Sequence, residues 1–150
     1  MTLKLRLVDA EQRDFDLCRV HMESWSLIIE AVIDKNEANN RLHIIFPDQI
    51  EHYQVTYETY KAKFIYDIYN SVKDGNCEGG GGKFFEVLSI EKYSQYLQEQ
   101  SDGLFLFHCG KNIKIYIFFF MDHLVEVASY APPKFVYSYT EEWKKYNSES

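Results

Sequence analysis

An apolar repeat near the N-terminus constrains the fold of this chain more than any other feature of the sequence. Six residues recur at steps of three and four, namely Phe15, Cys18, Met22, Trp25, Ile29 and Val32. This spacing places side chains along one face of an α-helix. Asp9 and Gln12, three residues apart, form a capping-box pattern just before the repeat. The sequence therefore predicts a long helix over about residues 10–38.

A second stretch of helical spacing follows Pro47. Its apolar and aromatic residues are Ile50, Tyr53, Tyr57, Tyr60, Phe64 and Ile68. Asp48 and Glu51 form another capping-box pattern, and Gly75 stands where such a helix would stop. The residues from Val55 to Tyr60 also alternate between apolar and polar types as a strand does, so this part of the stretch could be either helix or strand.

The remaining sequence favours short strands separated by turns. Strands are predicted at residues 3–8, 42–46, 84–88, 104–109, 113–121, 124–130 and 135–139, with short helices at 89–100 and 141–147. The glycine-rich residues 76–83 are predicted as a flexible connection, since they lack the pattern of a phosphate-binding loop.

The predicted fold class is α+β, with two longer N-terminal helices packed on a largely antiparallel sheet and a C-terminal β-meander. A chain of 150 residues fits a single domain spanning 1–150.

The charge balance narrows the classes of partner. The chain has 16 Lys and Arg against 23 Asp and Glu, a formal net charge of −7. Such a charge disfavours nucleic acid and anionic membranes as partners and favours basic proteins. The N-terminus lacks the apolar core of a signal peptide, and three cysteines do not form a disulfide framework, so a cytoplasmic location is expected.

Histidines and cysteines offer weak candidates for chemistry. Cys18 and His21 are spaced to ligate a metal from one helix, but Cys18 belongs to the apolar repeat and is expected to be buried. A small enzyme using His108, Cys109 and His123 is the alternative, although no known nucleophile motif surrounds the cysteine. We therefore predict no catalytic residue, no metal and no cofactor.

The first predicted helix also carries a second apolar strip bordered by carboxylates. Asp16, Glu23 and Glu30 repeat every seven residues and would form a column beside that strip. The predicted partner-binding residues are Asp16, Leu17, Val20, Glu23, Leu27, Glu30, Asp34 and Glu37. Carboxylates beside an apolar strip suit a basic partner, because charge speeds encounter while the strip is buried. The structural alternative is a helix sandwiched between the sheet and the second helix.

Several segments of the second half occur in an order found in a known family. They are Phe46-Pro47, Gly75, Leu88-Ser89-Ile90-Glu91, Asp102-Gly103-Leu104-Phe105-Leu106-Phe107 and Tyr137-Ser138-Tyr139-Thr140-Glu141-Glu142-Trp143. This order resembles the SUKH superfamily, many of whose members are bacterial immunity proteins. The long first helix and the first strand depart from the family pattern. The resemblance covers at most residues 46–147 and implies an α+β protein without catalytic residues that neutralises a cognate toxin by direct contact.

Together these features favour a non-enzymatic, acidic binding protein. The leading hypothesis is an immunity or antitoxin protein that occludes the active groove of a basic toxin, such as a nuclease. The alternatives are the small His/Cys enzyme and a homo-oligomeric structural module in which the second apolar strip pairs with itself.

Overall fold

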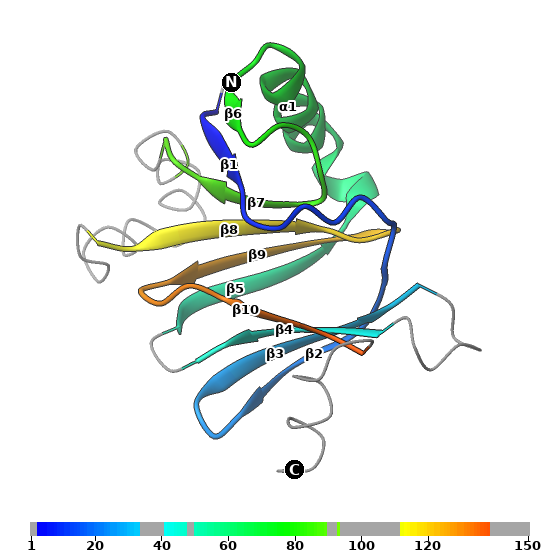
Figure 1. Ribbon diagram of the computed structural model, residues 1–150, viewed down its shortest axis with the longest axis vertical. Coiled ribbons are helices and arrows are strands. Elements are labelled where there is room, and N and C mark those ends of the chain that lie inside the picture. The colour runs from blue at the N-terminus through cyan, green and yellow to red at the C-terminus, as the bar shows by residue number, and fades with distance from the viewer. Residues whose placement is uncertain (1–2, 34–40, 48–49, 90–92, 94–111, 139–150) are drawn as a thin grey trace.

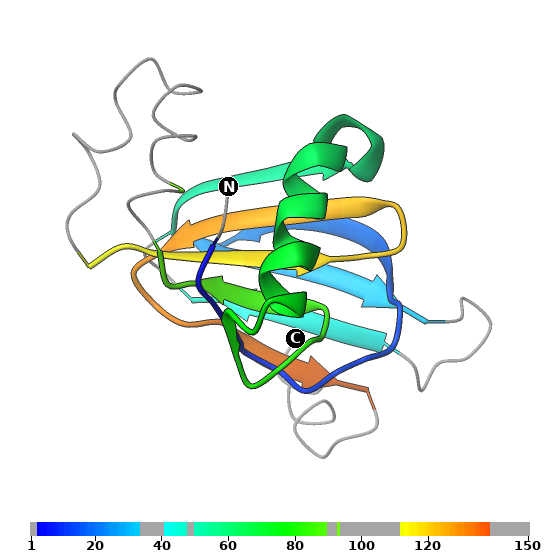
Figure 2. The same cartoon turned by 90° about the horizontal axis from the view of Figure 1, so that it is seen from above.

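The computed structural model describes residues 3–33, 41–47, 50–89, 93 and 112–138. Within these residues the chain forms two β-sheets and one α-helix, arranged as three layers (Figure 1). The helix α1 covers one face of a six-stranded sheet, and a four-stranded sheet covers the other face (Figure 2).

The larger sheet has the strand order β5-β9-β8-β7-β1-β6. Its strands are β5 (Ile50–Tyr57), β9 (His123–Ser129), β8 (Lys114–Phe119), β7 (Phe84–Val87), β1 (Leu5–Leu7) and β6 (Cys77–Glu78). The smaller sheet contains, in spatial order, β10 (Lys134–Tyr137), β4 (Arg41–Phe46), β3 (Ser26–Val32) and β2 (Asp16–Glu23). Neighbouring strands are antiparallel except β1 and β6. A 3₁₀ helix, η1 (Glu58–Lys61), joins β5 to α1 (Ala62–Lys73).

Strand β8 lies at the centre and is buried on both faces. Ile115, Ile117 and Phe119 pack in the core beneath α1, whereas Tyr116 and Phe118 pack between the two sheets. A strand covered on both faces needs apolar side chains at successive positions, which explains the uninterrupted apolar run.

The predicted helix over residues 10–38 is wrong, because this segment contains a β-hairpin. Strands β2 and β3 pair antiparallel across a turn at Ser24 and Trp25, whose φ angles are 49° and 72°. Strand β3 is rich in β-branched residues and also pairs with β4, so Leu27 and Ile29 enter the core between the sheets. Pairing on both edges and burial of one face override the helical spacing of the repeat.

The second predicted helix is only half correct. Residues Ile50–Tyr57 form β5, whereas the alternation noted in the sequence ran from Val55 to Tyr60 and overlaps this strand only in part. The α-helix begins at Ala62 and ends at Lys73. The predicted α+β class with two longer N-terminal helices is therefore contradicted: the described chain is mostly sheet with one short helix. Gly75 does follow that helix, with a φ of 81° that favours glycine.

The C-terminal strands predicted at 113–121, 124–130 and 135–139 are confirmed as β8, β9 and β10, but these three do not form one meander. β8 and β9 form a hairpin in the larger sheet, whereas β10 crosses to the smaller sheet and pairs with β4. The predicted strand at 104–109 and the helix at 141–147 lie outside the described residues, as does nearly all of the helix at 89–100. Residues 76–83, predicted as a flexible connection, include β6.

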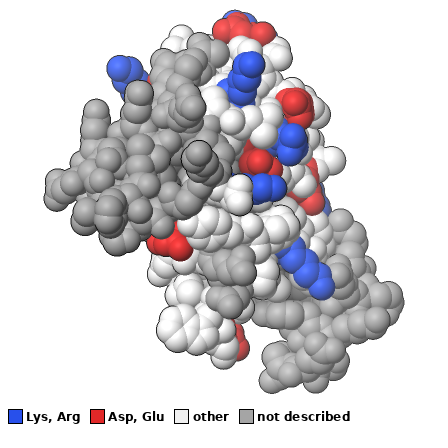
Figure 3. Space-filling model, turned by 90° about the vertical axis from the view of Figure 1, so that its left-hand side faces the viewer, with Lys and Arg blue, Asp and Glu red and all other residues white. Residues whose placement is uncertain are grey.

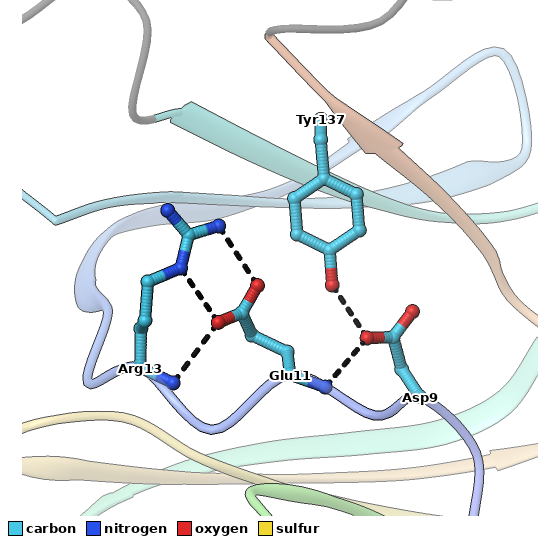
Figure 4. A network of polar contacts seen from close by, with 4 residues as sticks. All are labelled: Asp9, Glu11, Arg13 and Tyr137. Carbon is cyan, nitrogen blue, oxygen red and sulfur yellow. Dashed lines mark hydrogen bonds and ion pairs between the residues drawn. The ribbon is translucent and has the colours of Figure 1, made fainter.

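The segment between β1 and β2 crosses from one sheet to the other and is held by polar contacts (Figure 4). Tyr137 Oη and the Glu11 N–H both donate hydrogen bonds to Asp9 Oδ1, at 2.7 and 2.9 Å. The Arg13 guanidinium binds both carboxylate oxygens of Glu11, at 2.7 and 2.8 Å, and lies over the Phe15 ring. These contacts fix where the chain enters β2.

Candidate functional site

Five residues at one end of the larger sheet, four of them exposed and Glu58 half-buried, form a surface that combines carboxylates with large apolar side chains. They are Tyr57, Glu58, Tyr60, Met121 and Asp122, called here the acidic–aromatic surface. Tyr57 ends β5, Glu58 and Tyr60 belong to η1, and Met121 and Asp122 lie between β8 and β9 (Figure 1). The Glu58 N–H donates to the Asp122 carbonyl oxygen at 3.0 Å, which joins the two segments.

The apolar part of this surface is unusually exposed for its size. Tyr60 is 82% exposed, and Tyr57 and Met121 are each more than half exposed. The Tyr57 ring is positioned by the His123 ring, whose centroid lies 4.5 Å away. Exposed apolar side chains that adjoin one another mark interaction surfaces, and tyrosine is enriched among residues that dominate binding.

The carboxylates give this end a negative field. Burial, and then the charge of Asp122, raise the pKa of Glu58, with a smaller contribution from Asp14. Lys83 and His123 oppose that rise, but the Lys83 ammonium lies 2.7 Å from Asp14. Because neighbouring carboxylates disfavour each other's charged form, a cation brought to this surface would be bound favourably.

The opposite end of the molecule has a different charge pattern. On its described part, basic and acidic side chains lie intermixed (Figure 3). Within the larger sheet, Arg6 of β1 likewise contacts Glu78 at 3.0 Å and Glu86 at 3.6 Å. Opposite charges that already compensate each other attract a basic partner weakly.

The structure separates the partner-binding residues that the sequence predicted. Asp16 and Leu17 begin β2 beside the acidic–aromatic surface, since the Met121 N–H donates to the Phe15 carbonyl oxygen at 2.9 Å. Glu23 lies at the far end of β2, and Leu27 is buried between the sheets. The seven-residue column of carboxylates therefore does not exist, because it required a helix.

The remaining predicted residues fall elsewhere. Val20 packs half-buried against the core between the sheets, and Asp34 and Glu37 lie outside the described residues. Glu30 lies on the outer face of β3, where its carboxylate contacts Arg19 and lies 3.1 Å from His43 Nε2 and 3.5 Å from His21 Nε2. A carboxylate so surrounded is not available to a basic partner.

Next to Glu30 lies a small cavity of about 250 Å³, lined by Cys18, Arg19, Glu30, Ala31, Val32, Arg41 and His43. Burial lowers the pKa of His43 more than the Glu30 charge raises it, so this imidazole is neutral at neutral pH. Among the described residues no group of three or more His, Cys, Asp or Glu is placed to hold a metal. His108 and Cys109 lie outside these residues, so the proposed enzyme constellation is not described.

Sequence reasoning missed all five residues of the acidic–aromatic surface. Tyr57 and Tyr60 were placed on the apolar face of a predicted helix, because tyrosine spacing alone does not distinguish a buried ring from an exposed one. A usable signal was present: Glu58 follows Tyr57 directly, and Asp122 follows Met121. An acidic residue directly after a large apolar one is consistent with an exposed position.

Comparison of the chain with family models, with curated proteins and with solved structures finds no match. The described part of the chain contains no helix with both the length and the apolar character needed to cross a membrane.

Proposed function

We propose that this chain is a non-enzymatic binding protein that captures a basic protein partner at the acidic–aromatic surface. The observation that carries the proposal is the juxtaposition of exposed Tyr57, Tyr60 and Met121 with the crowded carboxylates of Glu58 and Asp122. The aromatic and methionine side chains supply surface to bury, and the carboxylates supply attraction and orientation.

A partner suited to this surface presents lysines or arginines around an apolar spot. A toxin whose active groove is basic, such as a nuclease, has this chemistry, since its own substrate is a polyanion. Binding would then neutralise the toxin by filling the groove, with no bond made or broken by this chain. This is the activity that the family resemblance led us to expect.

The proposal is tested by locating where the protein attracts a cation. Tetralysine is titrated into the uniformly ¹⁵N-labelled protein, and amide shifts are followed by NMR. We expect the largest shifts at residues 57–60 and 121–122, with affinity falling as salt is raised, because salt screens exposed charges over about 10 Å at 0.1 M. Shifts spread evenly over all acidic residues would reject the surface as a binding site.

A pair of charge-matched variants separates local attraction from net charge. Glu58→Gln with Asp122→Asn removes two carboxylates from the acidic–aromatic surface. Glu23→Gln with Glu78→Gln removes two exposed carboxylates elsewhere. The first variant should lose about fivefold in tetralysine affinity and the second less than about twofold. Equal losses would show that only the overall charge matters.

A further inference from the structure

In the described part of the chain the edge strands of the two sheets are β6, β10, β2 and β5, and β5 is the least protected against strand addition. β6 has two residues, and β10 has four and follows Pro132 and Pro133. β2 is interrupted by a bulge between Leu17 and Arg19. Short length, proline, charge and bulges are the devices that protect strand edges. Strand β5 has few of these protective features.

Strand β5 has a register shift of its own between Ile50 and His52, at its first residues, and is regular beyond it. From His52 to Tyr57 it pairs with β9 without interruption, and this stretch contains no Lys, Arg, Asp, Glu or Pro. In the part of the chain that the structure describes, β9 is its only strand neighbour. The outer row of its main-chain N–H and C=O groups is therefore placed for another strand.

The side chains of β5 indicate which residue types an added strand would need at each position. Tyr53 and Val55 lie opposite Val127 and Val125 of β9, on the face turned toward the smaller sheet, yet they are 40% and 41% exposed. Tyr57 continues the same face into the acidic–aromatic surface. Glu51 and Glu58 stand at the two ends of the strand. An added strand would fit with apolar residues on this face and basic residues at its ends.

We propose that the basic partner contributes an extended segment that pairs with β5 as an additional strand of the larger sheet. This inference rests on the proposed function and names the form in which the partner binds. The main-chain hydrogen bonds of the added strand would provide affinity, while its apolar side chains cover Tyr53, Val55 and Tyr57. Its terminal lysines or arginines would lie beside Glu51 and Glu58 and fix the register.

The probe is the acetylated and amidated peptide Lys-Val-Thr-Val-Thr-Val-Lys. Its valines share one face, and its lysines fall at the two ends. The comparison peptide is N-methylated at the five residues between the lysines, which removes main-chain donors but keeps the charge and the side chains. Affinities are measured by NMR titration, and strand addition predicts that methylation weakens binding by at least about tenfold.

The outcomes of this comparison are distinct. Equal binding of both peptides would overturn strand addition while leaving capture of cations intact. Binding of neither peptide, with no shifts from tetralysine, would overturn the proposed function itself. A dimer detected by light scattering without peptide, and disrupted by Val55→Lys, would show that a second copy occupies β5 and would overturn the proposal.

Two variants of the protein provide a matched control. Val55→Lys places a charge on β5, and Met22→Lys does so on β2, at apolar side chains that are 41% and 45% exposed. We expect Val55→Lys to weaken binding of the unmethylated peptide by about tenfold or more and Met22→Lys to change it less than about twofold. A similar loss in both would place the peptide outside β5.

Discussion

The Lys61 Nζ atom lies 3.5 Å from Glu126 Oε2, and both side chains are buried beneath α1 at the point where β5 turns into the helix. The Tyr93 hydroxyl donates a hydrogen bond to the other carboxylate oxygen of Glu126. Burial, followed by the Glu126 charge, raises the pKa of Tyr93, so its hydroxyl stays protonated. Because solvent hardly reaches this cluster, we interpret it as structural.

The cluster predicts a large loss of stability when its charges are unbalanced. Glu126→Gln leaves the Lys61 charge buried without its carboxylate, and we expect a loss of about 3 kcal/mol in the free energy of unfolding. The measurement is urea denaturation followed by circular dichroism. The double variant Lys61→Met with Glu126→Gln should recover part of that loss. A double variant no more stable than Glu126→Gln would contradict the buried ion pair as the cause.

The contact between Glu11 and Arg13 predicts a pH dependence. The hydrogen bonds from Arg13 lower the pKa of Glu11, so the folded state holds this carboxyl proton less tightly than the unfolded state. The resulting stability is present above the unfolded-state pKa of about 4.3 and is lost as the pH falls through the lower folded pKa. Glu11→Gln should therefore cost about 0.5 kcal/mol near neutral pH, and the difference should shrink as the pH falls toward about 3. A difference independent of pH would show that the carboxylate charge does not contribute.

The end of α1 predicts that one glycine is required for its backbone conformation. Gly75 has a φ of 81°, and its N–H donates to the Val72 carbonyl oxygen at 3.1 Å. Gly75→Ala should reduce the free energy of unfolding by about 1 kcal/mol, because a Cβ disfavours this conformation. The control is Gly81→Ala, where a Cβ would meet Val72 only at 3.4 Å and no left-handed φ is involved. Chemical denaturation that finds equal losses would argue against the conformational explanation.

The exposure of Tyr60 predicts that binding and stability can be separated. Its side chain is 82% exposed, so Tyr60→Ala should change the free energy of unfolding by less than about 0.5 kcal/mol. If the acidic–aromatic surface binds a basic partner, the same variant should weaken peptide binding by about five- to tenfold. Calorimetric titration with the Lys-Val-Thr-Val-Thr-Val-Lys peptide measures the second effect. Unchanged affinity would exclude Tyr60 from the contact.

Several local features were predictable because they depend on few neighbours. The alternation of Leu5 and Leu7 with charged residues gives β1, and the apolar run from Ile115 to Phe119 gives a strand buried on both faces. The position of Gly75 marks the end of a helix. Each of these follows from side-chain periodicity or from a backbone conformation that one residue type favours.

The predicted column of carboxylates depended on the predicted helix and does not exist without it. Asp16, Glu23 and Glu30 share a face only at helical periodicity, and in the hairpin they lie on two strands and in different surroundings. Spacings of three and four also occur in a bulged strand joined to a second strand by a turn, as at β2 and β3. The residues close to β3 in the sequence do not indicate that β3 pairs with both β2 and β4. That pairing is the reason why this segment forms strands and not a helix.

The sequence by itself determined the negative charge, the central apolar strands and the helix stop, since these depend on composition or on neighbours along the chain. Only the tertiary structure decided that β10 joins β4, that β5 forms a sheet edge and that Tyr57 and Tyr60 are exposed beside Asp122. The physical reason is that edges and exposure depend on which distant strands cover a residue, and burial of the shared core selects those strands.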